Sequence, residues 1–271
     1  MSGSRKFEEY EKALHQAEYF KISGAGVTHI KGVIVKIAGT GKLEDDRLAI
    51  AGSGVICGSI SLQSVKASGS LRIEGDLEAK SLSISGSCLI EGSLTSEQVI
   101  SSGSCKILGD TKIESLLKSS GSFKAGRIKV GRIVASGSFS TDDIDADDIR
   151  IEGTIDVSGN IICNTLYLRL KNRSQIKGHV RAEHVEIEGE YTSKLGILGL
   201  VKRSRGVPQL KVKRIEAGEI VLREIHLICE EVKADRISIG PDTIVEGQIL
   251  YRENIDVHPS AQLSREPKRT A

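Results

Sequence analysis

The sequence predicts an all-β chain that winds into a single-stranded, right-handed parallel β-helix (a β-solenoid) with about 17 residues per coil and a triangular core. Three observations predict it. Glycines recur at a nearly fixed spacing, short apolar pairs alternate with polar residues, and one template repeats in SGSLRIEGDLEAKSLSI and SGSCLIEGSLTSEQVI. A fixed period of this length is typical of stacked repeat architectures.

Glycine and serine mark the corners of each coil. One glycine series falls at 52, 69, 86, 103, 121, 137 and 153, and a second falls at 41, 58, 75, 92, 109 and 126 and resumes at 159. Glycine adopts the positive φ values that tight corners require, and serine can hydrogen-bond the local backbone there.

The strands lie between these corners. In one repeat the apolar residues come as pairs with one polar residue between them, which places each pair on one face of a short strand. One coil cannot bury such a face, but stacked coils about 4.8 Å apart can. The residues expected to stack in the core are Leu71, Ile73, Leu77, Leu82, Ile84, Cys88, Ile90, Leu94, Cys105 and Ile107.

The uneven steps within a repeat favour the right-handed class. Left-handed hexapeptide solenoids are built from equal six-residue steps. Here the steps are about six and about eleven residues, with slips of one residue between repeats.

The chain divides into five segments. We expect an N-terminal tail or short amphipathic helix at 1–21, a main β-helix at 22–191, a basic and apolar interruption at 192–214, further β-helix coils at 215–263, and a disordered tail at 264–271. Phe7, Tyr10, Leu14 and Ala17 would share one face of the N-terminal helix.

Composition and motifs indicate no enzyme. Aromatic residues make up 3%, tryptophan is absent and the net charge is +2, which disfavours a deep pocket or a base-stacking surface. The acidic run TDDIDADDIR lacks the glycine and glutamate that an EF-hand requires, and the six histidines are scattered. We therefore expect no catalytic residue, no metal and no cofactor. No signal peptide or membrane span is evident, so a cytoplasmic location is expected.

The interruption is the candidate contact surface. It combines the apolar run LGILGLV with cations and has no acidic residue, which suits an anionic membrane surface. The alternatives are an exposed loop that packs on the flank of the solenoid and, since no aromatic residues interleave with the charges, a less favoured nucleic-acid contact. The candidate residues are Lys194, Leu195, Ile197, Leu198, Leu200, Lys202, Arg203, Arg205, Lys211, Lys213 and Arg214.

The repeats resemble those of the bactofilins, the polymer-forming cytoskeletal proteins of bacteria. The stretch ISIGPDTIVEGQILYRENIDVHPSAQL (237–263) carries the resemblance most clearly, which extends over 22–263 and is greatest to the larger Gram-positive members. The resemblance implies a right-handed β-helix that assembles end to end, without nucleotide, into filaments lacking polarity. Such filaments act as scaffolds that localise other proteins.

The ends of a solenoid independently favour assembly, because each presents unpaired backbone groups that can template another chain. The expected partners are further copies of the chain, an anionic membrane surface and recruited proteins; nucleic acid is not expected. Two alternatives remain: a non-polymerising β-solenoid accessory or membrane-assembly protein, and a hexapeptide-type acyltransferase, which the uneven spacing disfavours.

Overall fold

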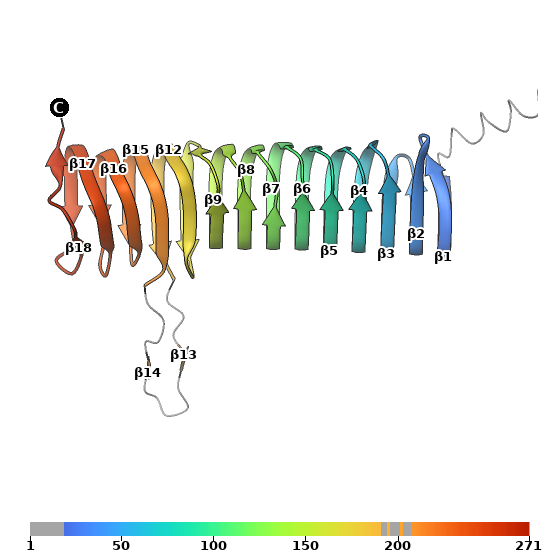
Figure 1. Cartoon of the computed structure of the whole chain (residues 1–271). Helices are drawn as coiled ribbons and strands as arrows, with labels where there is room; N and C mark the ends of the chain where they lie inside the picture. Colours follow the sequence, from blue (N-terminus) through green and yellow to red (C-terminus); the bar gives the residue numbers. More distant parts are fainter. Residues whose placement is uncertain (1–18, 191–193, 196–200, 203–206, 271) are drawn as a thin grey trace, which may run out of the picture. The chain divides into compact units, whose positions relative to one another are not determined.

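The computed structural model describes residues 19–190, 194–195, 201–202 and 207–270, and within these residues it contains strands and turns but no helix (Figure 1). Backbone contacts divide the chain into two compact units, Met1–Arg127 and Ile128–Ala271. The strands of unit 1 are β1 (Tyr19–Ile30), β2 (Val33–Glu44), β3 (Arg47–Cys57), β4 (Ile60–Ile73), β5 (Leu77–Ile90), β6 (Leu94–Ile107) and β7 (Thr111–Lys124).

Unit 2 holds the remaining strands. They are β8 (Ile128–Thr141), β9 (Ile144–Val157), β10 (Ile161–Ile162), β11 (Thr165–Leu170), β12 (Ser174–Gly189), β13 (Lys194–Leu195), β14 (Val201–Lys202), β15 (Gln209–Arg223), β16 (His226–Ile239), β17 (Ile244–Val257), β18 (Gln262–Leu263) and β19 (Lys268–Arg269).

Parallel pairing of successive coils builds both units. In unit 1, β3 to β7 pair in sequence, and Gly52, Gly69, Gly86, Gly103 and Gly121 lie in one register. In unit 2 the same pattern joins β8 to β9, β12 to β15, β15 to β16 and β16 to β17. The predicted parallel β-solenoid with about 17 residues per coil is confirmed.

The core is a stack of three-sided layers. In the coil around β4 the buried pairs are Ile60 with Leu62, Val65 with Ala67, and Leu71 with Ile73, and corner residues separate the pairs. Cys88 follows Leu71 in register and Cys105 follows Cys88, so like positions stack between coils. All ten residues expected in the core are buried.

Contacts between neighbouring coils fix the corners at both glycine series. Gly69 has a φ of 122°, and a side chain there would meet the carbonyl oxygen of Gly52 in the coil below. At the second series, side chains link neighbouring coils. The Asp76 backbone N–H donates to Ser59 Oγ at 2.9 Å, and the Ser93 N–H donates to Asp76 Oδ1 at 2.7 Å.

The first strands differ from the expected solenoid, because β1, β2 and β3 pair antiparallel. The turns between them are Lys31–Gly32 and Asp45–Asp46, and all four residues have positive φ. Two-residue turns of this kind match the twist of the hairpin strands. Lys31 Nζ donates to Asp46 Oδ2 at 2.8 Å and to the Ser61 carbonyl at 3.0 Å, which ties both turns to the first parallel coil.

The other segment boundaries also differ in detail. The expected N-terminal helix falls mostly on residues 1–18, which lie outside the described residues, and β1 already begins at Tyr19. The interruption is an insertion within unit 2, since β12 and β15 on its two sides pair directly. The final segment, expected to be disordered, contains β19, which pairs with β17 at Leu250 and Tyr251.

Candidate functional site

The N-terminal edge of unit 1 is strand β1, which pairs with β2 on one side. Except for the buried Ile30, its inward-facing side chains are only half-buried: Phe20 lies opposite the fully buried Leu43, and Thr28 lies opposite the fully buried Val35. Val27 is 65% exposed. Among the described residues β1 has no second partner strand, and a long strand with one unpaired side and accessible apolar groups is the kind of edge that pairs with another chain.

The C-terminal edge of unit 2 has a shorter unpaired segment than β1. Strands β18 and β19 cover β17 at Ile244–Val245 and Leu250–Tyr251. Among the described strands, residues 254–257 of β17 pair with β16 alone, and Ile255 and Val257 are half-buried there. This end therefore offers about one short side of a coil for pairing.

The structure places the candidate residues of the interruption in two groups. Lys194 and Leu195 in β13 pair antiparallel with Lys202 and Val201 in β14, whereas Lys211, Lys213 and Arg214 belong to the parallel strand β15. The remaining candidates lie outside the described residues: Ile197, Leu198, Leu200, Arg203 and Arg205. Their contact with a membrane stays a prediction.

A groove of about 460 Å³ in unit 2 adjoins the second group. Lys211 and Lys213 are exposed on either side of the buried Val212, and Lys177 from β12 joins them in the lining together with Glu230. Arg214 is engaged elsewhere, because its Nη2 lies 3.1 Å from Glu231 Oε1. The sequence analysis did not include Lys177 in this cluster, because the insertion separates it along the chain from its spatial neighbours.

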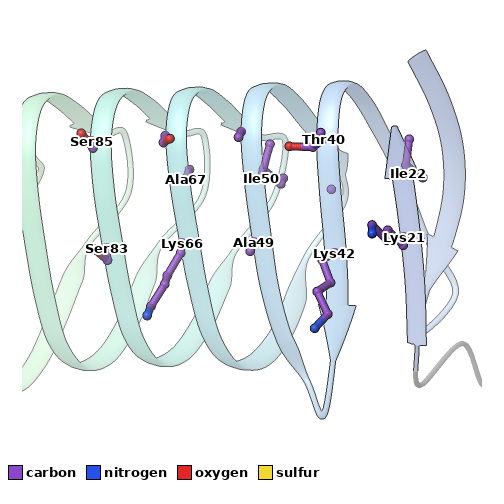
Figure 2. A pocket seen from close by; sticks show the side chains of 13 residues that line it. Lys21, Ile22, Thr40, Lys42, Ala49, Ile50, Lys66, Ala67, Ser83 and Ser85 are labelled. Atoms are coloured by element: carbon purple, nitrogen blue, oxygen red, sulfur yellow. The ribbon is translucent and has the colours of Figure 1, made fainter. Parts of the chain in front are cut away.

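A second groove, of about 560 Å³, lies on the outer face of unit 1. Lys21, Lys42 and Lys66 line it (Figure 2). The other lining residues are the hydroxyl residues Thr40, Ser68, Ser83 and Ser85, the isoleucines Ile22 and Ile50, one glycine and three alanines. No acidic residue is part of this lining. Lys42 forms an ion pair with Glu44, which lies outside the groove, and a hydrogen bond to Glu44 raises the pKa of Lys42.

One register line explains why these lysines come together. Lys21 lies opposite Lys42, Lys42 opposite Ala49, Ala49 opposite Lys66, and Lys66 opposite Ser83. The sequence analysis missed the cluster because two of these pairings are antiparallel, so the three lysines have no common spacing along the chain.

The acidic run at 141–150 has structural contacts. Asp145 pairs with Lys129 at 3.3 Å, Asp148 pairs with Arg132 at 3.0 Å, and Asp143 Oδ1 accepts a hydrogen bond from the Asn160 N–H. The apolar residues of this run face the core. In the part of the chain that the structure describes, no group of three or more His, Cys, Asp or Glu side chains could hold a metal ion.

Cys88 and Cys105 occupy neighbouring coils of the core and are both free thiols. A hydrogen bond with Cys105, together with burial, raises the pKa of Cys88. The pair therefore packs as small apolar residues. Searching residues 19–270 where they are described, we find no helix with the length and apolarity to cross a bilayer.

Comparison with known proteins connects this fold to a family. Residues 99–194 match the family model Bactofilin, described as polymer-forming cytoskeletal. This segment is similar to the bactofilins. The match covers about a third of the chain and confirms the resemblance, although it does not include 237–263, where the sequence analysis placed the clearest signal. No curated protein and no solved structure matches the chain.

Proposed function

We propose that this protein is a bactofilin-like cytoskeletal scaffold that assembles end to end into filaments without nucleotide and localises other proteins. The role is structural rather than enzymatic. The observation that carries the proposal is strand β1, an edge of 12 residues whose inward side chains, apart from the buried Ile30, are half-buried in the single chain. The match to a family described as polymer-forming supports it.

Assembly through β1 has a clear energetic source. A second copy that pairs with β1 would complete its backbone hydrogen bonds and bury side chains such as Phe20 and Thr28. Charges at these positions remain partly hydrated in the single chain but would be buried in the contact, where an unpaired charge is costly.

Negative-stain electron microscopy of purified protein without nucleotide or metal tests this proposal. We expect filaments from the wild type and only short particles from Phe20→Lys/Thr28→Lys. The matched control is Leu108→Lys/Ile162→Lys, which adds two charges at apolar residues that are more than half exposed and lie outside β1 and β17. Discrete monomers of the wild type at high concentration would contradict the proposal and favour a non-polymerising accessory protein.

The interruption supplies the proposed membrane contact of the scaffold at the inner face of the cell membrane. Basic residues near an anionic surface each contribute about 1 kcal/mol of binding, and the apolar run LGILGLV could enter the interface. Co-sedimentation with phosphatidylserine-containing vesicles should fall strongly when residues 195–205 are deleted. Equal sedimentation of both proteins would remove the membrane contact while leaving filament assembly intact.

A further inference from the structure

The lysine-lined groove of unit 1 lies outside the segment that matches the bactofilin family model. We propose that it binds an extended acidic segment of a partner protein. The proposal does not require filament formation, because every residue of the groove belongs to one chain; Lys21 and Ile22 lie on β1, so the groove borders the proposed assembly contact.

The charge of the groove favours a negatively charged occupant. Within the described residues, Lys21 and Lys66 form no ion pair, and the lining contains no acidic side chain. Lys42 shares its charge with Glu44, but both partners are about half exposed. Such a surface pair contributes little and can exchange for another carboxylate.

The dimensions of the groove suit one extended chain. The lysines lie on a register line that crosses five strand segments, from Lys21 through Lys42, Ala49 and Lys66 to Ser83. At about 4.8 Å per strand this line is roughly 19 Å long, and an extended peptide rises about 3.3 Å per residue. The groove therefore accommodates about six residues.

Small side chains form the floor. Thr40, Ala51, Ser68 and Ser85 follow one another in register, two residues along each strand from the lysine line. Short side chains leave room beside the long lysines, and the hydroxyl groups can donate hydrogen bonds to carboxylates or peptide carbonyls. The row thus offers specific contacts as well as charge.

Other anionic partners fit this surface less well. Single-stranded nucleic acids bind proteins by stacking their bases on aromatic side chains and on arginine, and the lining contains neither. The two large apolar residues of the lining are the half-buried Ile22 and the buried Ile50, so the groove offers little apolar surface to insert into a bilayer.

Fluorescence anisotropy with fluorescein-labelled hexaglutamate tests the proposal at low and physiological salt. Lys21→Gln/Lys66→Gln should weaken binding about fivefold or more, since two charge contacts are lost. The matched control Lys106→Gln/Lys124→Gln removes two exposed lysines of unit 1 that lie outside the groove, and should bind like the wild type. Circular dichroism checks that each variant is folded.

The variant Ser68→Phe distinguishes binding inside the groove from nonspecific electrostatic attraction to the lysines. It fills the middle of the floor without changing the charge, so hexaglutamate binding should be lost while the lysines remain. The proposal would be overturned if Ser68→Phe bound hexaglutamate as tightly as the wild type does. It would also be overturned if the control variant Lys106→Gln/Lys124→Gln lost as much affinity as Lys21→Gln/Lys66→Gln. Tighter binding of a single-stranded DNA hexamer or of phosphatidylserine vesicles through Lys21 and Lys66 would overturn it as well, as would an absence of hexaglutamate binding at millimolar concentration.

Discussion

Replacing the buried Ser101 by alanine is expected to stabilise unit 1. Ser101 is 1% exposed and stacks in register between Ile84 and the buried Ser119, whose hydroxyl is also unpaired among the described residues. The Oγ of Ser101 has no hydrogen-bond partner among the described residues. An unpaired buried hydroxyl costs about 1–3 kcal/mol, and alanine has nearly the same volume, so we expect a gain of about 1 kcal/mol in the free energy of unfolding.

Ser96 provides the matched control in the same strand. It is also buried, at 3% exposure, but its Oγ donates a hydrogen bond to the Gln98 carbonyl at 3.0 Å. Ser96→Ala should therefore lower stability by about 1 kcal/mol. Urea unfolding followed by circular dichroism at low protein concentration measures both changes. A loss of stability in Ser101→Ala as large as that in Ser96→Ala would refute the reasoning.

Three further predictions concern the core. Ile73 is fully buried, so Ile73→Asp places an unpaired carboxylate inside the coil; thermal unfolding should show a loss of several kcal/mol, and an unchanged melting curve would contradict its inward position. Gly86 has a φ of 131° and contacts Gly69 closely, so Gly86→Ala should cost about 1–3 kcal/mol in the same assay, whereas Ser85→Ala next to it should be nearly neutral. Burial raises the pKa of Cys163 from an ordinary value of 9.0 to about 12, so the native state holds this proton more tightly than the unfolded state. Its contribution to stability is complete below pH 9 and lost as the pH rises towards 12; a pH series of unfolding free energies that is equally steep for Cys163→Ala would exclude it.

The solenoid could be predicted because its determinants are local and periodic. Gly69 must be glycine for its own φ, and the short apolar pairs alternate as strand faces require. Because the coils stack in register, the same local pattern recurs in each coil. The interruption was likewise visible as a break in the period, although β15 begins at Gln209, inside the range assigned to it, because Leu210 and Val212 already occupy core positions.

The antiparallel pairing of β1, β2 and β3 was not predicted, because the prediction assumed glycines at a constant spacing along the chain. Gly24 and Gly39 lie symmetrically about the Lys31–Gly32 turn, and Gly39 and Gly52 lie symmetrically about the next turn. Mirror symmetry of this kind is the signal of hairpins, in contrast to the constant spacing of parallel coils. The unit 1 groove was missed for the same reason, since its lysines meet only through these reversed pairings.

The reversed start also affects how two copies would meet. Because β1 is antiparallel to β2, a second β1 can extend the sheet in the same antiparallel pattern about a twofold axis, which gives an isologous contact. The free part of β17 is limited to residues 254–257 and belongs to a parallel coil. The two proposed contacts therefore differ in length and in strand direction. Because a twofold contact through β1 joins only two copies, a filament also needs the C-terminal contact, and charges at either end should abolish long filaments. Charges at Ile255 and Val257 should leave dimers joined through the longer β1 contact, whereas charges at Phe20 and Thr28 should leave mostly monomers. Monomers from the Ile255 and Val257 variant, measured by analytical ultracentrifugation, would contradict a leading role for β1.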